Sequence, residues 1–262
     1  LAREPVTPLA RALLGSRHLR RLLGLRVAEL GVSRRFAYAV LETGHVGVAY
    51  AWQGEPIPRR LLEEETLEGL LVYAWQHPAA TQASLAAASA ALSLLLSEEP
   101  GLVEWEPGWR LLDAMGIGEG SRVAVVGLVG GLVEELRRRR ATVVVYEDDP
   151  LHRREAERLG VEARPGGQLA LEAAGYSHIV ATGASLLTPE AWSAVRGSEA
   201  VKGLVGPTAS LPLDAAMELG YTAVAGSVVP PEQSGAALRL ARAGYGFRVL
   251  RRHMRKWLWA RG

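Results

Sequence analysis

Four short apolar runs in the second half of this chain each end in glycine. The runs are Val123 to Gly127, Ile179 to Gly183, Val201 to Gly206 and Thr222 to Gly226. Unbroken runs of Val, Ile and Ala are typical of parallel strands that are buried on both faces of a sheet. In open α/β sheets the ligand binds beyond the carboxyl ends of the strands, where the backbone must come close to it. We therefore predict that the loops after these strands converge on one ligand site.

Helical segments alternate with these strands. A further strand is predicted at Thr142 to Tyr146. Helices are predicted from about Gly131 to Arg140, from Pro150 to Leu159, and onward from Pro189, Leu213 and Pro231. Because a parallel pair of strands needs a crossover connection, this alternation predicts right-handed βαβ units and a Rossmann-like sheet with helices on both faces.

The first half of the chain has a different pattern. Residues Gly31 to Trp52 alternate between apolar and polar side chains around a turn at 42–44, which predicts a β-hairpin. Helices are predicted at Thr66 to Trp75 and at Thr81 to Leu96. The second of these is apolar on every side, so we expect it to be buried.

The two patterns together predict an α/β protein of two domains. We assign residues 1–110 to a small N-terminal α+β domain with a leading helical segment, and residues 111–262 to a Rossmann-like domain. The segment Ser97 to Gly120 is rich in Pro and Gly, with a short helical piece around Leu111, and is the expected linker.

Composition excludes some classes of site. The chain has 262 residues and no cysteine, which rules out disulfides and thiolate metal ligands within it, and the cytoplasm is the expected location. The longest apolar run, Leu85 to Leu96, is shorter than the roughly 18 residues of a membrane span and is broken by serines, so no span is expected. Lys202 and Lys256 are the only lysines beside many arginines, and asparagine is absent. This bias favours a heat-adapted protein, although a GC-rich genome produces a similar bias.

The loop after the first strand of the second half resembles part of a nucleotide site. Gly127 is followed by Leu128, Val129, and the pair Gly130 and Gly131, and then by a helix whose free N–H groups can receive an anion. Glu147 lies twenty residues after Gly127, where an acidic side chain binds ribose hydroxyls. The spacing departs from G-x-G-x-x-G, which weakens a pyrophosphate site and leaves an adenosyl or other small ligand. Glycines that only permit tight turns are the alternative.

A metal site has less support. Glu147, Asp148 and Asp149 with His152 have the side chains to chelate a cation, but three acids at the start of a helix also suit its dipole without a metal. The six histidines show no close H-x-x-H or H-E-x-x-H pairing, so zinc is not indicated. The cofactor is left open between a nucleotide-like ligand and a metal chelate.

Hydroxyl side chains follow several of the glycines. We expect them to line the same site, with helix capping as the alternative for some of them. No G-x-S-x-G motif or catalytic triad is present, so a hydrolase has no support. The predicted ligand contacts are Gly127, Leu128, Gly130, Gly131, Glu147, Thr182, Gly183, Gly206, Pro207, Thr208, Gly226 and Ser227.

Two basic segments raise the question of nucleic acid. Arg137 to Arg140 end a predicted helix, where positive charge suits the dipole. Residues Leu250 to Gly262 place Leu250, Met254 and Trp257 at helical spacing beside basic residues, which predicts an amphipathic helix. We expect its Trp face to pack on the protein itself, with a membrane or phosphate surface as the alternative. No nucleic acid partner is expected.

The order of these segments resembles the putative heavy-metal chelation family of unknown function. The resemblance runs from about residue 30 to 250 and implies an enolase N-terminal-like domain joined to a Rossmann-like domain, with a ligand site between them. It is carried by residues 44–49, 86–92, 123–127, Glu147, 181–183, 205–208 and 225–226.

The chain also departs from that family's pattern. Ser89 and Ala90 stand where the family tends to have an Asn-Ala pair, and Pro230 and Pro231 follow Val229 where an acidic residue is common. Loss of these polar groups favours binding over turnover.

The leading hypothesis is therefore a small-molecule or metal-chelate binding protein whose N-terminal domain closes over the site. The alternatives are an adenosyl- or nicotinamide-nucleotide-dependent enzyme, methyltransferase-like or oxidoreductase, and a partner-binding protein; the sequence also allows a homodimer.

Overall fold

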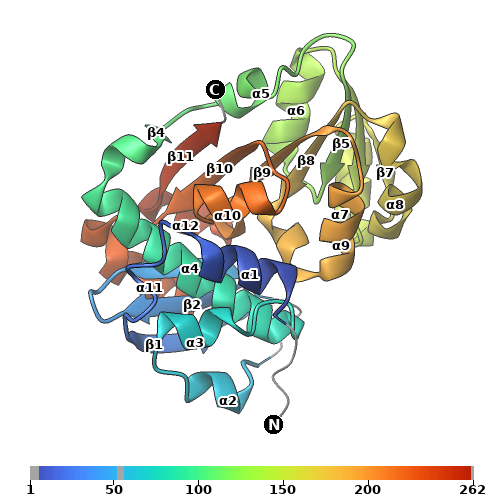
Figure 1. Cartoon of the computed structure of the whole chain (residues 1–262). Helices are drawn as coiled ribbons and strands as arrows, with labels where there is room; N and C mark the ends of the chain where they lie inside the picture. The colour runs from blue at the N-terminus through green and yellow to red at the C-terminus, as the bar shows by residue number, and fades with distance from the viewer. Residues whose placement is uncertain (1–5, 52–55, 261–262) are drawn as a thin grey trace.

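A computed structural model describes residues 6–51 and 56–260 and contains two β-sheets (Figure 1). The large sheet has eight strands in the order β4-β11-β10-β9-β8-β5-β6-β7. Their bounds are β4 Glu104–Trp105, β5 Arg122–Val126, β6 Thr142–Tyr146, β7 Glu162–Arg164, β8 His178–Thr182, β9 Val201–Val205, β10 Ala223–Val228 and β11 Arg255–Ala260. The six strands from β7 to β10 are parallel, whereas β11 is antiparallel to both β10 and β4.

Twelve α-helices are described in the same residues. They are α1 Pro8–Gly15, α2 Arg59–Leu62, α3 Leu67–Leu71, α4 Pro78–Glu98, α5 Arg110–Ala114, α6 Gly130–Arg138, α7 Pro150–Arg158, α8 Leu169–Glu172, α9 Pro189–Arg196, α10 Leu213–Glu218, α11 Ser234–Arg242 and α12 Phe247–Leu250. The predicted alternation of strands and helices in the second half is confirmed. The predictions missed the three-residue strand β7, whose sequence Glu-Ala-Arg lacks the apolar run of a buried strand.

The parallel strands are apolar throughout because helices cover both faces of the sheet. Val123 and Val125 of β5 pack in one cluster with Leu132 of α6. Ala124 and Val126 point to the other face and belong to the cluster that contains α4. Successive side chains of a strand point to opposite faces, so a strand buried on both faces must be apolar at every position.

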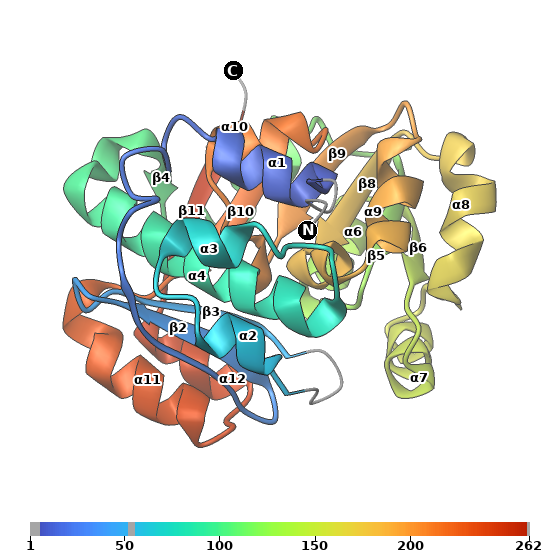
Figure 2. The same ribbon diagram turned by 60° about the horizontal axis from the view of Figure 1, so that its bottom comes forward.

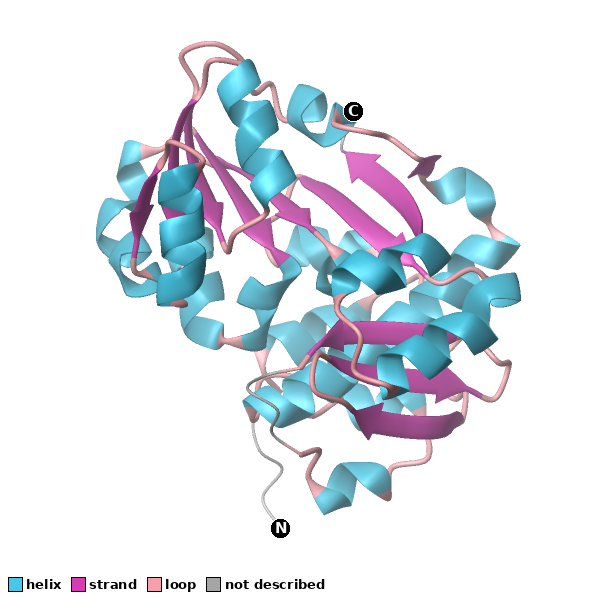
Figure 3. Cartoon of the chain, turned by 180° about the vertical axis from the view of Figure 1, so that it is seen from behind, coloured by secondary structure: helices cyan, strands magenta, loops and turns pink. Residues whose placement is uncertain are grey.

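The small sheet is antiparallel in the order β1-β2-β3 (Figure 3). Its strands are β1 Val27–Val32, β2 Phe36–Leu41 and β3 Val46–Tyr50. The predicted hairpin is the β2–β3 pair, with Val40 opposite Val46 beside the predicted turn. The structure adds β1, which begins before the predicted range.

Helix α4 runs between the two sheets (Figure 2) and contacts β2, β3 and β10. Gly47 of β3 permits this packing, because a Cβ there would lie 2.1 Å from the backbone nitrogen of Ala90. The helix is longer than predicted, and every residue from Ala79 to Leu96 is buried. Among the described residues, α4 alone is long and apolar enough to cross a membrane by length and composition, and its whole 18-residue window is buried in the protein. A core helix passes the same test, so this is weak support for a span.

Each half of the chain also packs a helix on the other half. Helix α1 packs on α10, where Asp214 accepts hydrogen bonds from the hydroxyl of Ser16 and the N–H of Arg17, both at 2.7 Å. Helix α11 packs on β2 and β3, and Arg242 forms an ion pair with Glu29 of β1. The two halves are therefore interlocked by both ends of the chain, and the domain boundary at residue 110 stays a prediction.

The predicted C-terminal helix is wrong. Within residues 250–260, Leu250 ends helix α12, Arg251–His253 form one 3₁₀ turn, and Arg255–Ala260 form strand β11. Trp257 is completely buried against the same cluster as α4, whereas Leu258 belongs to the opposite face of the sheet. Leu250, Met254 and Trp257 keep helical spacing, but pairing with β10 satisfies the backbone of residues 255–260 as an added strand. Residues 261 and 262 lie outside the described residues.

The first predicted helix is longer than the helix in the structure, and the expected linker contains a strand besides its predicted helical piece. Helix α3 covers only Leu67–Leu71 and is followed by turns up to Trp75, whose φ of 64° ends any helical path. The expected linker, residues 97–120, is not free chain: it contributes strand β4 and helix α5, which packs on β10 and β11. Its Pro and Gly residues separate these short elements.

Candidate functional site

The loops after β5 and β8 meet at the point where the strand order reverses. Gly127, after β5, has φ of 82°, and a Cβ there would lie 2.4 Å from the Oγ1 atom of Thr182 at the end of β8. Only glycine tolerates both the positive φ and this close approach. In doubly wound sheets the ligand crevice lies at this topological switch point. The space beside Gly127 is thus occupied by Thr182.

Glu147 reaches from the end of β6 to the loop after β5. Its Oε2 atom accepts a hydrogen bond from the N–H of Leu128 at 3.0 Å, and its Oε1 atom accepts one from the N–H of Asp149 at 3.1 Å. The side chain is 17% exposed. A carboxylate has about four acceptor positions, so Glu147 can still accept hydrogen bonds from a ligand while it positions the glycine loop.

Helix α6 begins in the same loop without a side-chain cap. The N–H groups of Gly130 and Gly131 donate to no acceptor in the described part of the chain. A Cβ on Gly130 would come no closer than 3.7 Å to Leu159, and one on Gly131 no closer than 3.7 Å to Trp109. Free N–H groups and the helix dipole make this first turn suited to an anion.

Gly206, after β9, borders open space. Its φ is 105°, in a region that side chains rarely adopt, and nothing lies within 4 Å of the position of a Cβ. Its N–H donates to the carbonyl oxygen of Ala225 at 3.0 Å. This glycine is therefore required by its backbone conformation, and its open side is available to a bound molecule.

The other predicted contacts are buried inside the protein. Thr208 is 2% exposed, and its Oγ1 atom accepts a hydrogen bond from the N–H of Tyr50 in β3 at 2.9 Å. The hydroxyl of Ser210 donates to the carbonyl oxygen of Ser227 at 2.8 Å and accepts from the N–H of the same residue at 3.2 Å. A Cβ on Gly183 would lie 2.2 Å from the nitrogen of Ala209. Pro207 is buried as well.

Gly226 is explained by packing within the sheet. It pairs with Trp257 of β11, and a Cβ at Gly226 would lie 2.4 Å from the Cζ2 atom of that ring. The glycine is required because the indole ring lies over the backbone of β10. The sequence alone offered no means of separating this role from a ligand contact.

Hydrogen bonds fasten the first half of the chain over this buried region. The Nε1 atom of Trp75 donates to the carbonyl oxygen of Leu186 at 2.6 Å, and the hydroxyl of Ser93 donates to the carbonyl oxygen of Val229 at 2.5 Å. Burial raises the pKa of Tyr50, with a smaller opposing effect from Arg35, so Tyr50 stays neutral at physiological pH. The interface contains no free charge at these positions.

The acidic residues after β6 bind backbone groups. Asp149 caps α7 by accepting from the N–H of Leu151 at 2.7 Å, and Asp148 accepts from the N–H of Gly166 at 2.9 Å. The Nδ1 atom of His152 lies 3.6 Å from the Oε2 atom of Glu147. The part of the chain that the structure describes holds no group of three His, Asp or Glu side chains placed to bind a metal ion. Without cysteine, the described side chains do not fit a resident heavy-metal site.

Trp109 is a residue that sequence reasoning missed. Trp109 is 39% exposed, and its ring lies beside the first turn of α6. A Trp next to a Pro-Gly pair in an expected linker carries no periodic signal, so only the packing of α5 on the sheet reveals it.

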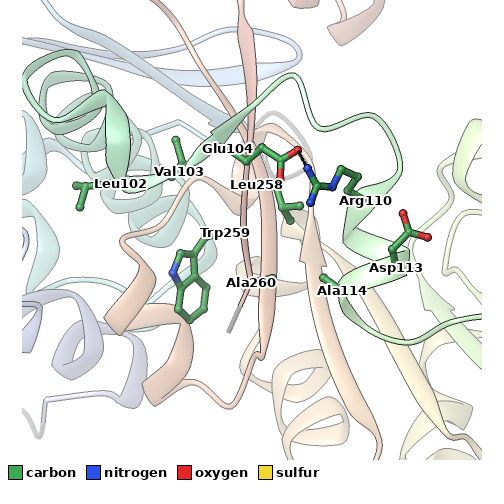
Figure 4. A pocket seen from close by; sticks show the side chains of 9 residues that line it. All are labelled: Leu102, Val103, Glu104, Arg110, Asp113, Ala114, Leu258, Trp259 and Ala260. Atoms are coloured by element: carbon green, nitrogen blue, oxygen red, sulfur yellow. Dashed lines mark hydrogen bonds and ion pairs between the residues drawn. The ribbon is translucent and has the colours of Figure 1, made fainter. Parts of the chain in front are cut away.

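A depression in the described structure lies elsewhere (Figure 4). Its volume is about 380 Å³, and Glu104 and Arg110 form an ion pair of 2.7 Å on its wall. Ala260 in its lining pairs with Ala223, the first residue of β10, so the depression lies at the opposite end of the sheet from Gly206. It is lined by Leu102, Val103, Glu104, Arg110, Asp113, Ala114, Leu258, Trp259 and Ala260.

Comparison with known families agrees with this architecture. Residues 110–260, more than half of the chain, match the DUF364 family, whose description is putative heavy-metal chelation. The chain belongs to this family. The match covers the whole parallel sheet of this DUF364 protein, including the switch point.

Two solved DUF364 structures share the fold of nearly the whole chain. A protein of unknown function from Pyrococcus horikoshii is 14% identical with a TM-score of 0.73, and the match covers 97% of this chain and 100% of that one. A second, from Desulfitobacterium hafniense, is 16% identical with a TM-score of 0.72, and covers 97% and 98%. At these identities the similarity shows the fold alone. No curated protein matches this DUF364 protein.

Proposed function

We propose that this DUF364 protein binds a small anionic or nucleotide-like molecule at the carboxyl ends of β5, β6 and β8. The observation that carries the proposal is the uncapped first turn of α6 at the switch point, where Gly130 and Gly131 present free N–H groups. The helix dipole and these donors attract a phosphate or carboxylate.

Glu147 supports a ligand that also carries hydroxyl groups. Its carboxylate lies at the end of the strand next to β5 and keeps acceptor positions beyond its bonds to Leu128 and Asp149. A ribose hydroxyl is the group that an acid at this place binds in doubly wound sheets. This observation also favours the second candidate function, an adenosyl-dependent enzyme.

A metal reaches this site as part of the ligand. The described side chains offer no group of three metal ligands, and the chain has no cysteine. A chelate with carboxylate or phosphate groups presents negative charge to the first turn of α6 in the same way as a metal-free anion. The family's description and the free N–H groups are both consistent with this form of binding.

The test is a thermal unfolding screen with S-adenosylmethionine, NAD, AMP, inorganic pyrophosphate, a tetrapyrrole and Ni²⁺ as probes. A ligand at one hundred times its dissociation constant adds about 2.7 kcal/mol to the unfolding free energy. We expect at least one anionic probe to raise the melting temperature. If no anionic probe stabilises the protein, the proposal fails.

A variant that adds a negative charge at the first turn of α6 tests whether the ligand binds there. Gly131 is exposed and has room for a side chain, so Gly131→Glu keeps the fold and puts a carboxylate where the anion would bind. We expect Gly131→Glu to abolish the stabilisation by the ligand, and the uncharged control Gly131→Gln to retain most of it. Equal stabilisation in both variants would place the ligand somewhere else.

A further inference from the structure

We infer that the ligand is no larger than one mononucleotide, a nucleoside with a single anionic group, because the chain itself fills the place of a second nucleotide. This inference rests on the proposed function. The size limit follows because other parts of the chain cover the strand ends in one half of the parallel sheet.

The parallel sheet has two halves that meet between β5 and β8. The first half is β5, β6 and β7, and the second is β8, β9 and β10. In a doubly wound sheet each half binds one mononucleotide, and a dinucleotide lies across both. The strand ends of the second half must therefore be accessible if this protein is to bind a dinucleotide.

The polar side chains just beyond the strand ends of the second half are buried. Thr208, Ser210 and Ser227 are 2%, 1% and 4% exposed. The Oγ1 atom of Thr208 accepts a hydrogen bond from the N–H of Tyr50, and the hydroxyl of Ser210 bonds to the backbone N–H and carbonyl oxygen of Ser227. At this degree of burial the three side chains have no space beside them for a second ribose and phosphate.

The cover over this half is held in place by buried contacts. Strand β3 contributes the Tyr50 N–H, and helix α4, buried from Ala79 to Leu96, contributes the hydroxyl of Ser93. Moving this cover would break both hydrogen bonds and expose the apolar faces of α4. Contacts of α1 with α10 and of α11 with β2 also join the first half of the chain to the second.

The strand ends of the first half remain accessible. Gly131 is exposed, and Gly127, Leu128 and Glu147 are half-buried. Gly206, at the end of β9 in the second half, has open space beside it, but it carries no side chain and its N–H donates to the carbonyl oxygen of Ala225. One ribose near Glu147 and one anionic group at α6 are what this half accommodates.

The experiment compares AMP with NAD, which contains the whole of AMP, by isothermal titration calorimetry on the full chain. We expect AMP to bind and NAD to bind no more tightly, since its second half makes no contact. We expect Glu147→Gln to raise the dissociation constant of AMP by about tenfold. Glu157→Gln, on the exposed side of α7, should leave that constant unchanged. NAD binding tenfold tighter than AMP would overturn the inference and leave the proposed function standing.

Hydrogen exchange supplies a readout that does not depend on affinity. AMP should slow exchange at the amides of residues 128–131 and leave those of residues 207–210 unchanged. Slowed exchange at 207–210 with NAD would overturn the inference. If neither nucleotide binds but pyrophosphate stabilises the protein and Gly131→Glu abolishes this, the inference fails and the proposed anion site holds. If none of the three binds, the inference fails, and the proposed function fails with it if no other anionic probe of the thermal unfolding screen stabilises the protein.

Discussion

The indole ring of Trp257 lies directly over Gly226, so that a Cβ on Gly226 would stand 2.4 Å from its Cζ2 atom. The ring is completely buried and cannot move into solvent. One methyl group on β10 would therefore push β11 away from the sheet. The last strand of the protein depends on this one missing side chain.

We expect Gly226→Ala to lower the unfolding free energy by at least the ~1–3 kcal/mol typical of overpacked cores. Urea unfolding followed by circular dichroism measures the change. Gly118→Ala is the matched control, because nothing lies within 4 Å of its Cβ position and its φ is not positive. Equal stability of the two variants would contradict the packing role of Gly226.

Thr208→Val should lower the unfolding free energy by about 1–3 kcal/mol, the cost of leaving a buried donor without a partner. The valine has a similar shape but cannot accept the hydrogen bond from the N–H of Tyr50. Thr208→Ser keeps the oxygen and should retain more of the stability. Thermal unfolding of the three proteins tests this, and a valine variant as stable as the parent would show that the bond contributes nothing.

Stability should fall as the pH drops below about 6.5. Burial lowers the pKa of His178, which lies against the carbonyl oxygen of Met115 at 2.9 Å, and burial also lowers that of His45 against a smaller opposing effect of Glu98. The unfolded state then binds more protons than the folded state, so the full stability is present above the unfolded pKa of 6.5 and is lost below it.

The measurement is the unfolding free energy from pH 7.5 to 5.5 for the parent and for His178→Gln. The variant should lose less stability over this range than the parent, although it is less stable at pH 7.5. An unchanged slope in His178→Gln would show that this histidine does not contribute.

Ni²⁺ by itself should leave the melting temperature unchanged, and a chelator such as EDTA should do the same. The reason is that the described residues place no three His, Asp or Glu side chains around one point. Thermal unfolding with and without each additive, at equal ionic strength, checks this. A rise in melting temperature with Ni²⁺ alone would mean that the protein holds the metal with its own side chains.

The order of elements in the second half could be predicted because buried parallel strands carry their signal in their own residues. Val123 to Val126 and Thr142 to Tyr146 are apolar at nearly every position, and glycine or an acid ends each run. The residues of β11 carry no such signal. Arginine, lysine and tryptophan there fit a helix equally well until Gly226 of a neighbouring strand accepts the ring of Trp257.

The candidate site was predictable only in part, because the sequence reveals local spacing but not contacts between distant segments. Gly130, Gly131 and Glu147 are near one another in the chain or lie at the ends of adjacent strands, so spacing placed them together. Nothing in the spacing shows that Thr208 is bonded to Tyr50, from which it is separated by 158 positions. The cytoplasmic location, heat adaptation and a homodimer stay predictions.

The sequence by itself determined most of the parallel strands and the helices between them, because hydrophobic pattern and glycine position act within a few residues. The tertiary structure alone decided which glycines adjoin open space and which adjoin another segment. Gly206 adjoins space, whereas Gly183 and Gly226 adjoin the protein itself. That difference depends on contacts between distant segments, and it determines which half of the strand ends a ligand can reach.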